Sequence, residues 1–176
     1  MNIRPAQPPD AAGIARVQVD SWRTSYQGII ADSVLANLSY AEREAGWTRA
    51  LTEEADRLDF YVAEAEEGEI LGFAVGGALR DTINGYNGEL FAVYLLQKAQ
   101  RRGCGRRLVK EVAGSMIERG FDAMVVWVLK DNHPARRFYE ALGGQLLTEK
   151  IIRIGEDDLT EVSYSWPDMR LLVDSH

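Results

Sequence analysis

The sequence predicts a mixed α/β fold in which helices cover one largely buried central sheet. Between residues 60 and 95, three strand patterns are separated by short glycine-containing turns, which indicates an antiparallel meander. Helical spacing of Leu108, Val112 and Met116 then gives way to AMVVWVL at 123–129, an apolar run typical of a strand buried on both faces. The 176 residues, 46% of them apolar, suit one globular domain over 1–176 with a sizeable core.

Three helices are predicted before the first strand. Asp10 can cap a helix over 11–23, on which Ile14, Gln18 or Val17, and Trp22 share one face. The next elements are a loop at 26–30, a short helix at 32–38, and a helix from the capping box Ser39-Tyr40-Ala41-Glu42 toward Glu54.

Six strands and two further helices complete the pattern. The strands are predicted at 60–65, 70–79, 89–95, 123–129, 147–154 and 160–166, with turns at 66–69, 84–88 and 155–158. Gly120 ends the helix that carries Leu108, and Gly143-Gly144 end a helix at 134–142. Pro167 follows the last strand and ends the pattern.

Composition excludes several classes of function. The net charge of −7 argues against general nucleic-acid binding and weakly favours a basic partner or substrate. One cysteine cannot form an internal disulfide, and with two histidines it cannot form a zinc cluster, so no metal is expected. The N-terminus lacks a hydrophobic signal segment, and no apolar run reaches membrane-spanning length. We therefore expect a cytoplasmic protein without a membrane partner.

The stretch QRRGCGRRLVK at 100–110 combines glycine with positive charge between a strand and a helix, an order that suits a phosphate site. It does not contain the G-x-x-x-x-G-K-[ST] pattern of a P-loop. A dinucleotide fingerprint fails because Leu108 stands in place of its third glycine. The pattern Q/R-x-x-G-x-G/A fits Gln100 to Gly105 in full.

Together with NHPARRFYEALGG at 132–144, this loop makes the chain similar to the GNAT superfamily of acetyl-CoA-dependent N-acetyltransferases. The matching segments follow in order and spacing over 89–146. The resemblance implies a mixed, mostly antiparallel central sheet of about six to seven strands flanked by about four helices. The chain departs from the family pattern at Leu95-Leu96-Gln97, where Val-x-Pro is common. The resemblance implies that backbone atoms make the pantetheine contacts there, so we expect little effect on cofactor binding.

The resemblance implies that acetyl-CoA is the co-substrate. Backbone N–H groups of about 101–106, at a helix N-terminus, would face its pyrophosphate, and one or two of the arginines at 101, 102, 106 and 107 would be only a solvated helix face. Cys104 is expected to turn a small apolar side chain toward the core rather than act as a nucleophile. The cofactor-binding residues implied are Val93, Tyr94, Leu95, Gln100, Arg101, Arg102, Gly103, Cys104, Gly105, Arg106, Asn132 and Tyr139.

Two residues match the family's catalytic positions. Tyr139 corresponds to the tyrosine that protonates the departing thiolate; it points about 100° away from Phe138 on a helix, so one ring can pack while the other reaches a cleft. Glu89 corresponds to the general base of some members, and simple alternation puts it on the face of Phe91, Val93 and Leu95. The alternatives are a core aromatic for Tyr139 and a solvated carboxylate for Glu89.

The resemblance implies that the acceptor is a primary amine of a small molecule or peptide, which would attack the thioester directly in a ternary complex. Trp22, Tyr26 and Tyr94 would wall its pocket, unless they are simply core residues. No sequence feature separates an amino acid, an antibiotic, a polyamine and a protein N-terminus, and homodimer formation stays open. A second class of function is a non-catalytic acyl-CoA sensor with the same fold, but that class is expected to lose the loop or the tyrosine, and this chain keeps both.

Overall fold

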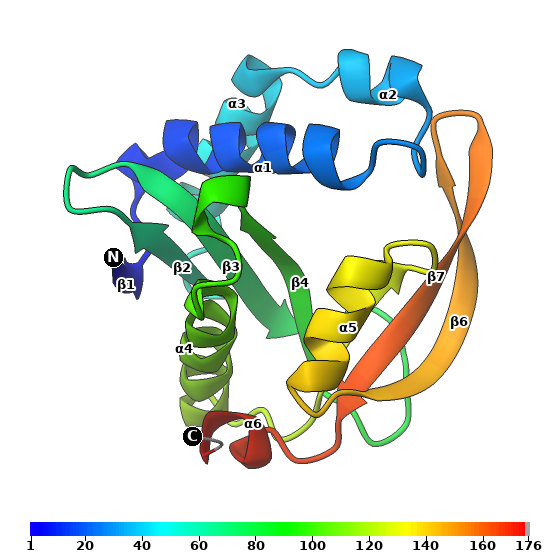
Figure 1. Cartoon of the computed structure of the whole chain (residues 1–176). Helices are drawn as coiled ribbons and strands as arrows, with labels where there is room; N and C mark the ends of the chain where they lie inside the picture. The colour runs from blue at the N-terminus through cyan, green and yellow to red at the C-terminus, as the bar shows by residue number, and fades with distance from the viewer. Residues whose placement is uncertain (175–176) are drawn as a thin grey trace.

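A seven-stranded sheet forms the centre of the computed structural model, in which residues 1–174 are described (Figure 1). The strands are β1 Asn2–Pro5, β2 Leu58–Glu64, β3 Ile70–Ala78, β4 Gly88–Leu95, β5 Met124–Leu129, β6 Gln145–Ile154 and β7 Asp157–Trp166. The α-helices are α1 Ala11–Ser25, α2 Asp32–Ala36, α3 Tyr40–Glu53, α4 Cys104–Glu118, α5 His133–Ala141 and α6 Arg170–Asp174. Short 3-10 turns cover Pro8–Asp10 and Gln97–Ala99.

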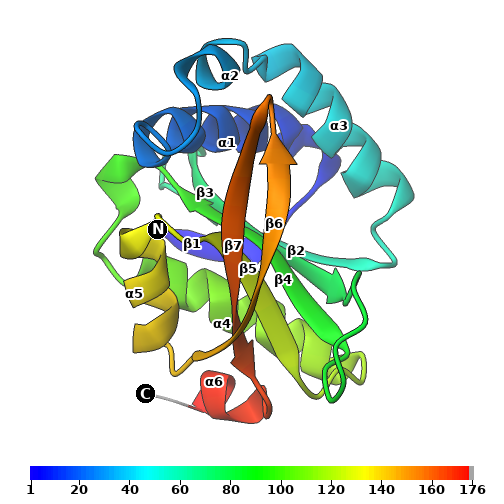
Figure 2. The same cartoon turned by 90° about the vertical axis from the view of Figure 1, so that its right-hand side faces the viewer.

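The strand order is β1-β2-β3-β4-β5-β7-β6, and every neighbouring pair is antiparallel except β4 and β5. This confirms the predicted mixed and mostly antiparallel sheet. Helices α1 and α3 lie on one side of it and α4 on the other (Figures 1 and 2). The α4 face that carries Leu108, Val112 and Met116 is fully buried, as its spacing predicts.

The sequence prediction missed two short elements. Strand β1 has only four residues, ends at a proline, and pairs with the distant β2, so its local pattern is weak. Helix α6 follows the proline that was taken to end the pattern. Ser39 does accept a hydrogen bond from the Glu42 N–H at the start of α3, but Asp10 makes no side-chain cap on α1. Its carboxylate instead accepts two hydrogen bonds from Arg4 and one from the Gln7 N–H.

The predicted alternation along β4 is wrong beyond Phe91. The register with β3 shifts between Val75 and Gly76, so β4 contains a bulge that adds one residue. After the bulge the two faces exchange. Val93 and Leu95 pack with the core on the α4 side, while Phe91 and Tyr94 pack with the core beneath α1 and α3. Glu89 therefore shares a face with Phe91 and, through the bulge, with Tyr94.

Candidate active site

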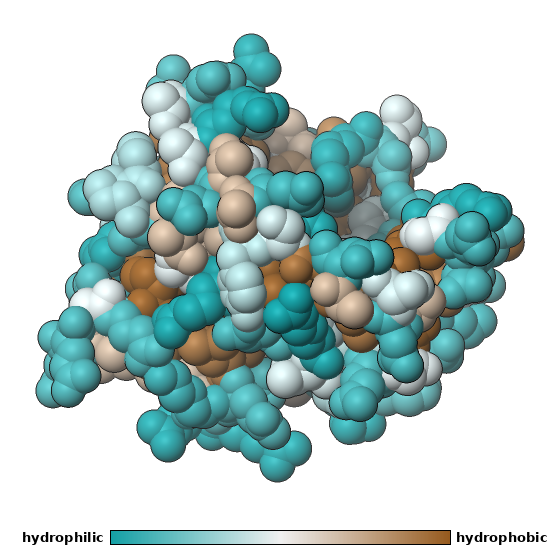
Figure 3. Space-filling model, turned by 90° about the horizontal axis from the view of Figure 1, so that it is seen from above, coloured by the Kyte–Doolittle hydropathy of each residue, from teal (hydrophilic) through white to brown (hydrophobic). Residues whose placement is uncertain are grey.

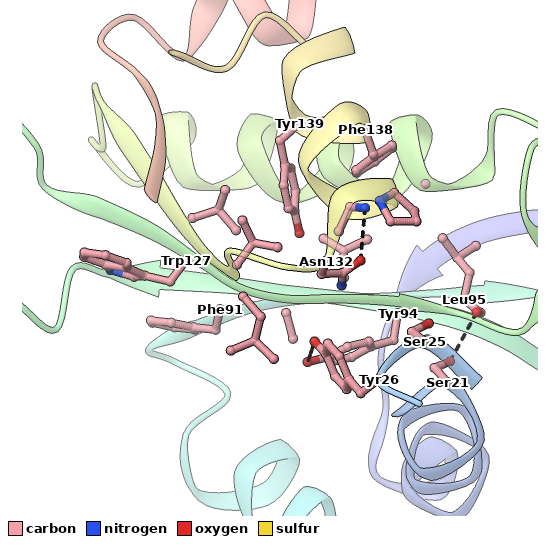
Figure 4. A pocket seen from close by; sticks show the side chains of 18 of the residues that line it. Ser21, Ser25, Tyr26, Phe91, Tyr94, Leu95, Trp127, Asn132, Phe138 and Tyr139 are labelled. Carbon is pink, nitrogen blue, oxygen red and sulfur yellow. Dashed lines mark hydrogen bonds between the residues drawn. The ribbon is translucent and has the colours of Figure 1, made fainter. Parts of the chain in front are cut away.

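Strands β4 and β5 part in the middle of the sheet. They are paired only from Gly88–Leu90 to Met124–Val126, although both strands continue. A cavity of about 630 Å³ opens where they separate, lined by residues of α1, β4, β5, α5, β6, β7 and the loop before α4. Figure 4 shows this cavity with side chains from both sides of the parting pointing into it. From above, apolar side chains appear between the hydrophilic ones that cover most of that face (Figure 3).

The glycine- and arginine-rich loop forms one end of the cavity. Gly103 has φ 75° and Arg101 φ 59°, and Arg101 is the only residue other than glycine with positive φ in the described chain. Such left-handed residues in a turn direct successive N–H groups to one side, which produces an anion-binding concavity. Helix α4 begins at Cys104, so its free N–H groups and the positive end of its dipole add to the same site.

Gly105 lies where α4 meets α5. A Cβ built there would come within 3.1 Å of two ring carbons of Phe138 and 3.2 Å of Leu95. The sequence favoured glycine here for close approach to a phosphate, whereas these contacts add a packing reason for glycine. The position therefore links the loop to the helix that carries Tyr139.

Tyr139 extends from α5 into the cavity (Figure 4). Its ring is buried and packs near the rings of Tyr164 and Trp166, with centroids 6.3 Å apart in both cases. The phenol has no hydrogen-bond partner among the described residues, and burial raises its pKa above the usual 10. A phenol in this setting stays protonated and has its O–H free to donate.

Three contacts fix the helix behind this tyrosine. The Asn132 side chain accepts a hydrogen bond from the Ala135 N–H and caps the first turn of α5. The Tyr164 hydroxyl donates to the Glu140 carboxylate at 2.6 Å. The indole N–H of Trp166 donates to the Leu142 carbonyl at 2.9 Å, just after the last turn. Both ends of α5 are thus tied down, which restrains the Tyr139 ring.

Glu89 is buried at the start of β4 and lines the opposite end of the cavity. Its two carboxylate oxygens accept hydrogen bonds from the Arg80 guanidinium, and one of them also accepts from the Arg80 N–H at 3.1 Å. The solvated carboxylate considered for this position is therefore not what the structure contains. The guanidinium in turn stacks on the Phe91 ring, 4.6 Å from its centroid.

Aromatic rings at the C-terminal end of α1 and toward the end of β4 form another wall of the cavity, beside Ser21 and Ser25 (Figure 4). Trp22 meets Tyr26 edge to face at a centroid distance of 5.0 Å, and the hydroxyls of Tyr26 and Tyr94 lie 3.5 Å apart. Burial raises the pKa of both phenols. The three rings line the cavity and also pack on neighbouring core residues, so the two interpretations of these positions are compatible.

Comparison with known proteins places this chain in a family. A sequence model described as FR47-like protein matches residues 70–153. The chain is 39% identical over 173 residues to "Uncharacterized N-acetyltransferase YuaI" of Bacillus subtilis (strain 168), covering 98% of this chain and 96% of that protein. The chain belongs to the GNAT superfamily of N-acetyltransferases.

Solved structures agree with the GNAT fold. The paiA N-acetyltransferase of Thermoplasma acidophilum, in complex with coenzyme A, has a TM-score of 0.68 at 20% identity, over 91% of this chain and 96% of that one. The putative acetyltransferase yncA of Salmonella typhimurium, with acetyl-CoA, has a TM-score of 0.71 at 23% identity, over 100% and 95% of the two chains. At these identities the likeness concerns the fold.

In this GNAT chain, the residues singled out from the sequence come together around one cavity. All of them line it except Arg102 and Cys104. Cys104 is buried in the core beside α4, as expected, and burial raises the pKa of its thiol. Within residues 1–174, no group of three or more His, Cys, Asp or Glu side chains is arranged to hold a metal, and no helix is both long and apolar enough to cross a bilayer.

Four charged or aromatic residues of the GNAT cavity escaped the sequence analysis: Arg80, Trp127, Lys150 and Glu161. Trp127 interrupts the aliphatic run of β5 and was the only one with a local signal. Arg80 lies between strands, and the other two sit on the final hairpin, far along the chain from the glycine-rich loop. Only the register of β5, β7 and β6 brings Trp127, Lys150 and Glu161 together.

Proposed function

We propose that this protein transfers the acetyl group of acetyl-CoA to a primary amine of a small molecule or peptide. The observation that carries the proposal is the cavity between the parted strands, which has the glycine- and arginine-rich loop at one end and the Glu89 carboxylate at the other, and which the Tyr139 phenol and an aromatic wall also line. Both substrates would occupy it together, so the amine would attack the thioester in a ternary complex. Residues 1–176 would act as a single domain.

The loop end would bind the coenzyme. N–H groups at 101–106 and the side chains of Arg101 and Arg106, which line the cavity, would face the pyrophosphate. Arg102, which lies outside the lining, would contribute charge only. The edge of β4 from Val93 to Leu95 has no pairing to β5, so its backbone would bond to the extended pantetheine arm, with Asn132 beside it.

Tyr139 would supply the proton for the leaving group. The neutral amine nitrogen attacks the thioester carbon, the tetrahedral intermediate collapses with cleavage of the carbon–sulfur bond, and the sulfur takes the phenol proton. The proton that the nitrogen loses as it becomes an amide returns to the phenolate. The raised pKa keeps the phenol proton in place until charge develops on sulfur. Solved structures of the same fold in complex with coenzyme A or acetyl-CoA support the proposal that this fold binds the acetyl donor.

Glu89 would receive the proton that the ammonium of the acceptor loses, through a water molecule. Its position in the cavity supports this role, and the hydrogen bonds from Arg80 would hold the carboxylate in one orientation. Trp22, Tyr26 and Tyr94 would enclose the acceptor.

The proposal is tested by thiol release from acetyl-CoA by the purified protein against a panel of primary amines, with acceptor-free reactions as the control. We expect thiol release that depends on the amine and a product heavier by one acetyl group in mass spectrometry. Tight acetyl-CoA binding without amine-dependent release from any member of a broad panel would favour the sensor class instead.

A further inference from the structure

Glu161 on β7 is one of the carboxylates that line the cavity. On β7 it lies directly opposite Leu129 of β5 on one side and Lys150 of β6 on the other. The side chain is half-buried and contributes to the cavity lining. A carboxylate is thus placed on the cavity wall, in a sheet interior where a charge is costly without a partner.

The nearby cations are engaged elsewhere. The Lys150 ammonium bonds to Asp81 at 2.7 Å and lies 4.0 Å from the centroid of the Trp127 ring. The Arg80 guanidinium is paired with Glu89. Within residues 1–174, the Glu161 carboxylate makes no hydrogen bond and no ion pair within 4 Å, although its backbone lies in the sheet between β5 and β6. Burial raises its pKa; Lys150 and Arg80 oppose this rise, and the charges of Glu89 and Asp81 add to it.

Apart from the paired charges near Glu161, much of the cavity lining is apolar or aromatic. Tyr26 and Tyr94 are close enough for the charge of Glu161 to raise their pKa. Other apolar residues that line the cavity are Trp22, Ile30, Phe91, Trp127, Leu129 and Ile154. Aromatic faces attract a cation, and apolar walls favour a hydrocarbon body over a hydrated one.

We propose that Glu161 binds the ammonium group of the acceptor, and that the acceptor is a monoamine with an apolar or aromatic body and no carboxylate. The inference rests on the proposed function for the identity of this part of the cavity as the acceptor site. An ammonium group bound in this cavity needs a negatively charged partner, and the unpartnered Glu161 carboxylate supplies it. An amino acid is disfavoured because its carboxylate would need a cation as a partner. The two nearby cations, Arg80 and Lys150, are already paired with Glu89 and Asp81.

The first experiment measures acceptor binding without chemistry. Calorimetry on the full chain saturated with coenzyme A compares 2-phenylethylamine with 2-phenylethanol, which has the same body without the charge, and with phenylalanine, which adds a carboxylate. We expect the amine to bind at least 10-fold more tightly than either. Equal binding of the alcohol, or tighter binding of phenylalanine, would overturn the inference.

The second experiment compares Glu161→Gln with Glu149→Gln. Glu149 is exposed on β6 and pairs with Lys130 outside the cavity lining, so it controls for the loss of one negative charge. We expect Glu161→Gln to weaken the binding of 2-phenylethylamine about 10-fold or more and to leave the affinities for 2-phenylethanol and acetyl-CoA unchanged. Glu149→Gln should bind all three ligands as the wild type does. The inference fails if Glu161→Gln retains wild-type affinity for the amine, or loses the alcohol equally, since the latter indicates a packing role.

The two levels of the proposal fail differently. Amine binding that depends on Glu161 without thiol release from acetyl-CoA would remove the proposed reaction and leave this site. Thiol release with other amines, combined with no binding of 2-phenylethylamine, would leave the reaction and remove this acceptor class.

Discussion

The Phe138 ring lies against Gly105, so close that a Cβ at residue 105 would approach two ring carbons to 3.1 Å. This contact joins the N-terminus of α4, where the anion-binding loop ends, to α5, which carries the proposed acid. The loop end of the cavity and the helix that carries Tyr139 are therefore in direct contact at Gly105.

Gly105→Glu is expected to abolish acetyl-CoA binding, because the new carboxylate would enter the cavity beside Phe138 and repel the pyrophosphate. Gly114→Glu is the matched control: it lies on the same helix, and a Cβ there meets nothing within 4 Å. Calorimetry should show near wild-type affinity for the control. If Gly105→Glu remains folded and binds acetyl-CoA normally, the phosphate-site assignment is wrong.

Tyr139→Phe retains the ring and its packing but removes the phenol proton. We expect kcat to fall by roughly 10- to 1,000-fold, near the range for a lost general acid, with little change in acetyl-CoA affinity. Tyr86→Phe is the control, since it removes a phenol hydroxyl that donates to Ser165 outside the cavity lining. It should cost about 1 kcal/mol of stability and little turnover. Wild-type turnover in Tyr139→Phe would leave that ring a packing role only.

Glu89→Gln tests the proposed base. Gln keeps the shape but cannot accept the proton, so we expect a lower kcat at neutral pH that partly recovers at high pH, where the amine deprotonates unaided. Tyr139→Phe should show no such recovery, because thiolate departure stays unassisted. The measurement is kcat against pH for both variants. A Glu89→Gln enzyme equal to wild type at neutral pH would restrict Glu89 to its pairing with Arg80.

Removal of Arg80 should destabilise the fold more than removal of Glu89. In this pair the Arg80 side chain is 67% exposed and that of Glu89 only 2%. Arg80→Met leaves a buried carboxylate without its partner, at a cost of about 1–3 kcal/mol or more, whereas Glu89→Gln leaves a cation that water can solvate. Urea denaturation of both variants measures the difference, and equal losses would contradict the assigned asymmetry.

Glu161 should make stability depend on pH. Its raised pKa means that the folded protein holds this proton more tightly than the unfolded chain does. The stabilisation is full below the ordinary value of 4.5 and is lost as pH rises through the raised folded-state pKa. Glu161→Gln, which stays neutral, is expected to have a higher Tm than wild type at pH 7 and to converge with it near pH 4. A lower Tm at pH 7 would show that the carboxylate has a stabilising partner.

Local signals were enough to predict most elements and the position of the glycine- and arginine-rich loop before α4. Helix caps, the apolar run of β5 and the spacing on α4 act within a few residues of each other, so the sequence displays them directly. The bulge in β4 is different, because it depends on how β3 and β4 pair. Alternation alone therefore placed Val93 and Leu95 on the wrong face relative to Glu89.

The proposed acceptor part of the cavity was less predictable for a similar reason. Trp127, Lys150 and Glu161 come from three strands, and no spacing rule connects them. Even their register leaves the pairing open, because Lys150 lies opposite Glu161 yet bonds to Asp81. Whether Lys150 pairs with Asp81 or with Glu161 depends on the three-dimensional positions of the side chains.

The parting of β4 and β5 also has a dynamic consequence. Only three residue pairs of β4 and β5 join the two halves of the sheet. We therefore expect the two halves to move relative to each other about this short paired segment. The amides of 91–95 on the free edge would then exchange with deuterium faster than those of the paired strands around them. A ligand that bonds along this edge replaces the missing strand, restrains this motion and slows that exchange.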